Sequence, residues 1–196
     1  MLPPTTALPM LPGHTSPAAS FDQPFEMLAA CHERVQRSLG LLQRLAAHLA
    51  EHGNDSPARS AAADVLRYFD LAAPHHHEDE ERHVFPALLR SPDAALRAAV
   101  EQLQRDHAEM RDLWSTLRVA LQAVAAGESA AFDAPTLALL QRFVALHQDH
   151  LRIEDSLVYP QARAAVGPGS LQMMGDEMAQ RRGATRPGSR LSGERG

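Results

Sequence analysis

The chain has 196 residues, of which 44% are apolar, 22% are charged and 5% are aromatic, with a formal net charge of −5. This composition predicts one helix-rich domain, and the mildly acidic charge gives no reason to expect nucleic acid or an anionic membrane as a partner. Cys31 is the single cysteine, which excludes an intrachain disulfide. We recognise no secretory signal and no run approaching about 18 apolar residues, so we expect a cytoplasmic protein without a membrane span.

Four segments with helical periodicity follow a Pro-, Thr- and Ser-rich stretch over residues 1–20, which we expect to be a flexible arm. Their apolar stripes, with residues at three- and four-residue steps, begin at Phe25, Val65, Val100 and Leu139. Such stripes predict amphipathic helices that face a common core. Because the links between them are short, we predict an all-α, up-down-up-down four-helix bundle over residues 21–168.

The breaks between these helices carry recognisable end signals. Ser91 and Pro92 are predicted to be the N-cap and first residue of the third helix, and Asp133 is predicted to cap the fourth. Pro74 lies inside the second helix and lacks a backbone donor, so we expect a kink or a helix restart there.

The C-terminal region is expected to have two parts. Residues 169–183 predict a short fifth helix, and we expect its methionines to cap one end of the bundle. Residues 184–196 are rich in Gly, Ser and Arg, and we expect them to form a disordered tail.

Each apolar stripe contains one histidine where an apolar residue would be expected. These core-facing histidines are His32, His76, His107 and His150. A single histidine of this kind is more often a core residue held by a hydrogen bond than a ligand. Counted from the helix ends at a rise of about 1.5 Å per residue, however, all four lie at nearly one level of the bundle. Four inward imidazoles at one level indicate a metal site.

Two glutamates share helix faces with two of these histidines. Glu80 follows His76 by four residues, and Glu154 follows His150 at the same spacing. A carboxylate that points into a bundle core costs several kcal/mol unless it is paired or bound to a metal. Two carboxylates beside four imidazoles suit a dinuclear site, because a carboxylate can bridge two ions.

The two motifs belong to an internal repeat. The sequence HHEDEERHVFPAL at 76–88 aligns with HLRIEDSLVYPQA at 150–162, and His32 and His107 are related by nearly the same offset. Within 75–81 alone, three pairs of a histidine and an acid have this spacing. The second copy contains one such pair, and its distance from the following proline selects His76 and Glu80.

The repeated pattern of His, His-x3-Glu and aromatic-Pro resembles the hemerythrin-like, or HHE cation-binding, family over about residues 22–166. The resemblance implies a four-helix bundle with a non-haem diiron centre that is bridged by carboxylates and often by an oxo or hydroxo group. Zn and Mn bind similar ligand sets and remain alternatives. The expected metal ligands are His32, His76, Glu80, His107, His150 and Glu154.

The chain departs from the oxygen-carrying hemerythrins that it resembles. Those proteins have a second histidine one turn away on the third helix, where Leu103 and Arg111 flank His107 here. Their fourth helix carries His-x4-Asp instead of His-x3-Glu. A set of four His and two Glu is similar to the iron-sulfur repair and nitric-oxide-responsive branch of the family. We therefore expect O2 or NO binding, or iron handling under oxidative or nitrosative stress, more than simple O2 carriage.

Two alternative functions remain open at this point. One is a diiron oxidoreductase that reduces NO or peroxide, and the other is a zinc-loaded structural protein. Whether the chain is an enzyme stays open, with a metal- and diatomic-ligand-binding protein favoured. A homodimer or a protein partner is possible.

Other histidines near the motifs are expected to lie around the site. We expect His83 and His147, each one turn from a proposed ligand, to lie at its rim or to support the ligands. His75 and His77 flank His76 at roughly 100° to either side, so we expect both to be partly exposed.

The acidic residues near the motifs have two different expected roles. Asp106 and Asp149 each precede a ligand histidine and are expected either to hydrogen-bond to these ligands or to form surface ion pairs. Glu78, Asp79 and Glu81 are expected to form a solvated acidic face.

Three further residues of the motif regions are expected to have packing roles. Cys31 precedes a proposed ligand and is expected to be a small buried residue. Trp114 and Tyr159 are expected to pack, with the Tyr159 hydroxyl finding a hydrogen-bond partner.

Overall fold

The structure of the protein is a computed structural model that describes residues 20–184. All regular secondary structure in this part of the chain is helical. The helical segments are α1 (Pro24–His52), α2 (Ser56–Arg67), η1 (Tyr68–Ala72), α3 (Ala73–Asp79), η2 (Glu80–Val84), α4 (Phe85–Leu88), α5 (Ala94–Ala126), α6 (Ala134–Ile153), η3 (Glu154–Val158), α7 (Tyr159–Ala165) and α8 (Pro168–Arg181). Except for one residue each, the expected N-terminal arm and C-terminal tail lie outside the described residues.

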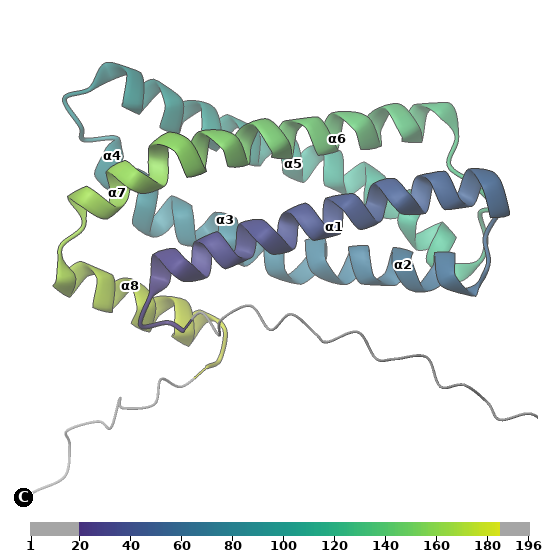
Figure 1. The fold of residues 1–196 in the computed structure, drawn as a ribbon, viewed down its shortest axis with the longest axis horizontal. Helices are drawn as coiled ribbons and strands as arrows, with labels where there is room; N and C mark the ends of the chain where they lie inside the picture. The colour runs from purple at the N-terminus through teal and green to yellow at the C-terminus, as the bar shows by residue number, and fades with distance from the viewer. Residues whose placement is uncertain (1–19, 185–196) are drawn as a thin grey trace, which may run out of the picture.

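These segments form four antiparallel rods and one short additional helix (Figure 1). The first rod is α1, the second runs from α2 to α4, the third is α5, and the fourth runs from α6 to α7. Consecutive rods pack against each other, and α1 also contacts α6, which closes the bundle. Helix α8 lies at the end of the bundle where α1 begins and α7 ends (Figure 1). The predicted all-α bundle with an extra C-terminal helix is confirmed.

Three aspartates begin helices by accepting hydrogen bonds from free backbone amides. Asp55 caps α2, and Asp133 caps α6 as predicted, with its carboxylate 2.8 Å from the amide nitrogen of Thr136. The predicted cap of the third helix was wrong, because α5 starts after Asp93 and not at Ser91. The Asp93 carboxylate accepts from two amides, whereas the Ser91 hydroxyl accepts from the amide of Asp93 itself. A charged acceptor that binds two amides makes the stronger cap.

The second and fourth rods contain three five-residue π-helical turns. Each turn is closed by a hydrogen bond from a backbone amide to the carbonyl five residues earlier, donated by Ala73, Phe85 and Tyr159. The residues immediately after these donors are Pro74, Pro86 and Pro160. In a regular α-helix a proline ring clashes with the carbonyl four residues before it, and a widened turn relieves this clash. Where a kink or a helix restart was expected at Pro74, the helix therefore continues through a widened turn, and the same turn occurs at both aromatic-Pro motifs.

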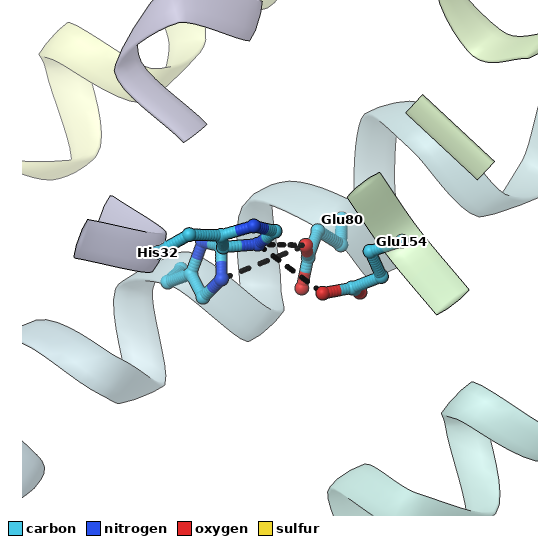
Figure 2. Close-up of side chains that lie close together, drawn as sticks. His32, Glu80 and Glu154 are labelled. Atoms are coloured by element: carbon cyan, nitrogen blue, oxygen red, sulfur yellow. Dashed lines mark ion pairs between the residues drawn. The ribbon is translucent and has the colours of Figure 1, made fainter. Parts of the chain in front are cut away.

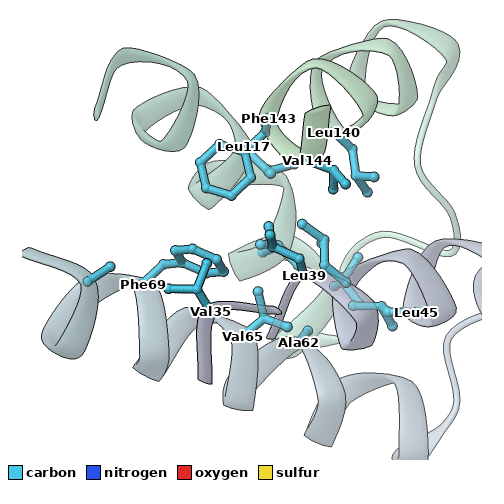
Figure 3. Packing of buried hydrophobic residues seen from close by; sticks show 14 of the residues in the cluster. Val35, Leu39, Leu45, Ala62, Val65, Phe69, Leu117, Leu140, Phe143 and Val144 are labelled. Atoms are coloured by element: carbon cyan, nitrogen blue, oxygen red, sulfur yellow. The ribbon is translucent and has the colours of Figure 1, made fainter. Parts of the chain in front are cut away.

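The interior consists of two apolar clusters separated along the bundle axis. The larger cluster includes Leu39, Val65, Phe69, Leu117 and Phe143 and fills the end where α1 meets α2 (Figure 3). The smaller cluster occupies the other end, and α8 contributes the buried side chains of Met174 and Met178 to it. The expectation that C-terminal methionines cap the bundle is thus confirmed. Among the described residues, no helix is long and apolar enough to cross a membrane.

Candidate metal centre

The six residues predicted to be metal ligands lie together between the two apolar clusters. All six are buried, and Glu80, His107 and Glu154 are 0% exposed. They fall into two groups, within each of which the candidate ligand atoms lie within 4.8 Å of one another. The groups are His32, His76, Glu80 and Glu154, and Glu80, His107, His150 and Glu154. Both carboxylates therefore belong to both groups.

The Glu80 carboxylate spans the two groups. Its Oε1 atom lies 3.6 Å from Nε2 of His76 and 3.9 Å from Nε2 of His32. Its Oε2 atom lies 3.4 Å from Nε2 of His107, in the second group.

Glu154 spans the groups in the same way. Its Oε2 atom lies 3.2 Å from Nε2 of His32, and its Oε1 atom lies 3.0 Å from Nε2 of His150. Figure 2 shows both carboxylates directed toward the imidazole of His32. Two carboxylates with one oxygen toward each group have the arrangement needed to bridge two ions.

Several buried polar atoms at this level lack a hydrogen-bond partner among the described residues. They are Nδ1 of His76, Oε2 of Glu80 and both carboxylate oxygens of Glu154. Buried polar atoms are normally paired, because an unpaired one costs free energy and a buried charge costs more. Metal cations would supply partners for the three carboxylate oxygens, so this donor set fits a metal.

The imidazole nitrogens support the same conclusion. Nε2 of His107 lies 3.1 Å from Nε2 of His150, while the Nδ1 atoms of both rings face carboxylates. If both Nδ1 atoms carry protons for these carboxylates, the two Nε2 lone pairs face the same small space. Such lone pairs repel unless a cation or a proton lies between them, and neutral imidazole nitrogens are common metal ligands.

Carboxylates outside the group hold three of the imidazoles. Nδ1 of His32 lies 2.8 Å from Asp155, and Nδ1 of His107 lies 3.0 Å from Glu81. Nδ1 of His150 lies 3.4 Å from Asp106, which is 6% exposed. A carboxylate that accepts from Nδ1 fixes the ring and directs Nε2 toward the glutamates, where a metal could be bound. The supporting role considered for Asp106 is confirmed, whereas Asp149 is exposed and pairs with Arg152.

The expected solvated face was wrong for Glu81 and Asp79. Glu81 is half-buried against His107, as described above. The Asp79 side chain is 0% exposed and lies 2.7 Å from Arg181 and 2.6 Å from Arg182. Both arginines belong to the α8 region, which covers this side of the second rod. Glu78 is partly exposed and fits the expectation.

The other histidines near the site, His77, His83 and His147, show no hydrogen bond to the six predicted ligands among the described residues. Nε2 of His83 lies 2.7 Å from Glu177 in α8, and Nδ1 of His147 donates to the carbonyl of Phe143 at 2.8 Å. His77 is partly exposed as expected, and its ring stacks on His107 at 4.0 Å between centroids.

Tyr159 contacts the site through hydrogen bonds as well as through packing. Its ring stacks on His32, as the expected packing role requires, and its hydroxyl bonds to Nε2 of His32 at 2.8 Å. The hydroxyl also donates to Glu80. Burial, together with the nearby carboxylates of Glu80 and Glu154, raises the pKa of Tyr159 well above its usual value. Tyr159 is therefore a neutral hydrogen-bond donor at the edge of the site.

Cys31 and Trp114 have the expected packing roles. Cys31 is a buried free thiol whose pKa is raised by burial. The ring of Trp114 packs on Phe69 and Phe143, and its Nε1 atom donates to Asp70 at 3.0 Å.

The charges of the site favour bound cations. Burial lowers the pKa of His32, but the nearby carboxylates of Glu154 and Glu80 outweigh it and raise the pKa to about 10. Burial likewise opposes protonation of His150, and Glu154 and Asp106 raise its pKa to about 10. The buried carboxylates thus attract positive charge strongly, whether it comes from protons or from metal ions that displace them.

The fold and this buried cluster of histidines and glutamates are those of a helical-bundle metal-binding protein. Residues 23–162 match the sequence model of the hemerythrin HHE cation binding domain. A protein of Haemophilus influenzae, named only as uncharacterized, is 30% identical over 164 residues, which cover 84% of this chain and 92% of the relative. The chain therefore belongs to the hemerythrin HHE cation-binding family. Helix α8 lies beyond the matched residues.

Proposed function

We propose that the protein binds a dinuclear iron centre through His32, His76, Glu80, His107, His150 and Glu154. The observation that carries this proposal is that each glutamate directs one oxygen toward each imidazole group. Each ion would have two imidazoles and two bridging carboxylates. Histidine and carboxylate ligands suit iron, and sites with open positions are typical of non-haem iron proteins.

Iron bound in this way would supply a change of redox state and open positions for a small ligand. We propose O2 or NO binding, or iron handling under oxidative or nitrosative stress, as in the repair and nitric-oxide-responsive branch that the ligand set resembles. The two apolar clusters on either side would protect the centre from bulk water. A single cysteine is compatible with the reducing cytoplasm that we propose as its location.

The second candidate function is a diiron oxidoreductase that reduces NO or peroxide. It is favoured by the Tyr159 hydroxyl, which bonds to two of the proposed ligands. A neutral hydroxyl in this position can hold or donate a proton at Oη beside the centre. Steady turnover of NO or peroxide in the presence of a reductant would support this candidate.

The test starts with protein purified from iron-supplied cells. Metal analysis should give about two iron atoms per chain, as the two ligand groups predict. After anaerobic reduction, titration with O2 and with NO should change the visible absorption spectrum. Zinc-loaded protein that responds to neither gas would contradict both functions and support a structural metal site.

A further inference from the structure

A cavity of about 340 Å³ lies beside the metal site, between the second rod and helices α5 and α6. Its volume falls within the range of about 300–1,000 Å³ that small-molecule sites occupy, and it is roughly ten times the share of one water in the liquid. A diatomic gas would need far less space. The cavity is therefore large enough for an organic molecule.

Aromatic side chains form the inner wall of the cavity. Phe69, Trp114 and Phe143 line it, and their ring centroids lie 5.0 to 5.8 Å apart. Figure 3 shows Phe69 and Phe143 reaching toward each other from different rods. Because Nε1 of Trp114 is bonded to Asp70, the indole contributes apolar surface. Walls of this kind favour an aromatic ring, through edge and face contacts.

His147 supplies one polar atom to this apolar surface. The residue is 3% exposed and lines the cavity, and its Nδ1 atom is held by the Phe143 carbonyl. A carbonyl accepts only, so the proton is on Nδ1, and Nε2 has no hydrogen-bond partner among the described residues. Burial lowers the pKa of His147 to about 3, which keeps the ring neutral. Nε2 is thus an acceptor that lacks a donor.

Two residues connect this cavity to the metal site. Glu81 lines the cavity and accepts from Nδ1 of His107, and His77 lines it and stacks on the same imidazole. At the mouth, Arg82 and Arg111 provide charged groups at the solvent boundary. A molecule in the cavity would therefore lie one side chain away from a proposed metal ligand.

We propose that this cavity binds a small aromatic molecule with one hydroxyl group, with the ring against Phe69, Trp114 and Phe143 and the hydroxyl donating to Nε2 of His147. This inference goes beyond metal binding and does not rest on it, because none of these contacts involves a metal. It assigns the protein a second ligand class, the phenols.

The chain contains a single tryptophan, so Trp114 fluorescence reports directly on this cavity. We would titrate the full-length protein with 4-ethylphenol and with 4-ethyltoluene, which differ by a hydroxyl in place of a methyl group. Both should change the fluorescence, and 4-ethylphenol should bind about fivefold more tightly, as one buried hydrogen bond predicts. If neither compound binds at millimolar concentration, the proposal is overturned.

The variants test the role of His147. In His147→Leu, 4-ethyltoluene should still bind, which shows that the cavity is intact, and the preference for 4-ethylphenol should disappear. His147→Gln retains an acceptor and should keep part of the preference. His52→Leu, on an exposed residue, should behave like the wild type. An unchanged preference in His147→Leu would overturn the proposed hydrogen bond.

Metal-free and metal-loaded protein should give the same preference for 4-ethylphenol. This comparison separates the cavity from the metal centre, because the cavity can bind phenols even if the proposed iron function fails. Binding that requires metal and leaves Trp114 fluorescence unchanged would mean that the phenol binds at the metal, and would overturn the assignment to the cavity.

Discussion

Glu81 and Asp155 each follow a glutamate that is proposed to bridge the two ions. Each accepts a hydrogen bond from an imidazole Nδ1 atom on another rod. Glu81 holds His107 and Asp155 holds His32, so each half of the repeat orients a histidine of the other half. These bonds fix the direction of the Nε2 atoms that face the glutamates. The two halves of the site are therefore linked by the carboxylates of Glu81 and Asp155 in addition to those of Glu80 and Glu154.

We predict that Glu81→Ala and Asp155→Ala each weaken metal binding by about 10- to 100-fold without abolishing it, because the histidine loses its orienting partner. Competition with a chelator of known affinity measures the change. Asp149→Ala is the matched control, since Asp149 also neighbours a proposed ligand histidine but is exposed and pairs with Arg152. Equal affinity in all three variants would show that these bonds do not orient the ligands.

Much of the site at this scale follows from the repeat in the sequence. The two copies single out all six residues that the structure brings together. The repeat also contained the missed signal, because an acid follows the glutamate in both copies, at 81 and 155. The role of Tyr159 was harder to predict, since its counterpart Phe85 has no hydroxyl and a hydrogen-bond partner depends on side-chain positions.

At the scale of elements, the π-helical turns place the two glutamates. Glu80 begins η2 and Glu154 begins η3, and an aromatic residue followed by a proline closes each turn. Apolar periodicity predicts these rods as helices but does not distinguish a five-residue turn from a regular one. The proline rings indicate where a distortion is needed, and the structure shows that the helix continues through a wider turn.

Helix α8 is attached to the bundle through one buried carboxylate in addition to its buried methionines. Asp79 is 0% exposed and is compensated by Arg181 and Arg182. The sequence predicts the helix and the role of its methionines but not this ion pair. The partners lie about a hundred residues apart, and nothing in the local sequence of either segment connects them.

We predict that the double substitution Arg181→Ala with Arg182→Ala lowers the free energy of unfolding by about 3 kcal/mol or more, because it leaves the buried Asp79 charge unpaired. Chemical denaturation followed by circular dichroism measures this change. The exposed pair of Arg152 and Asp149 provides the control, and Arg152→Ala should cost no more than about 0.5 kcal/mol. Similar losses in both variants would refute the role assigned to α8.

Acid should weaken the attachment of α8 through Glu177. Hydrogen bonds from Arg181 and His83 lower the pKa of Glu177 from 4.5 to about 2. Because the folded-state pKa is the lower one, this contribution to stability is complete above about pH 4.5 and is lost as the pH falls toward 2. Glu177→Gln should therefore melt at a lower temperature than the wild type at pH 6.

The difference in melting temperature between the two proteins should shrink steadily below pH 4.5. Comparison with Glu177→Gln removes the effect of other carboxyl groups that titrate in the same range. A difference that stays constant from pH 6 to pH 2 would contradict the lowered pKa.

At the scale of the whole molecule, a polar layer lies between two apolar clusters. The larger cluster and the smaller cluster with its α8 methionines fill the two ends of the bundle. Burial of each large apolar side chain contributes roughly 1.5–3 kcal/mol, which can offset the cost of the buried histidines and glutamates. The stability of the fold thus comes mainly from the ends, and the middle layer is available for chemistry.

The four-rod arrangement could be predicted because the stripes are long and the links are short. The cavity beside Trp114 could not, since its walls come from three rods and its shape depends on how their side chains pack. The position of α8 at one end of the bundle likewise depends on contacts between distant segments.

The central claim is that Glu80 and Glu154 each bind both ions of a dinuclear centre. Metal analysis of purified variants tests it most directly, with Glu78→Ala as control because Glu78 is partly exposed and pairs with Arg82. We predict about two iron atoms per chain in the wild type and in Glu78→Ala, and less than about one in Glu80→Ala and in Glu154→Ala. Equal metal content in all four proteins would contradict the claim.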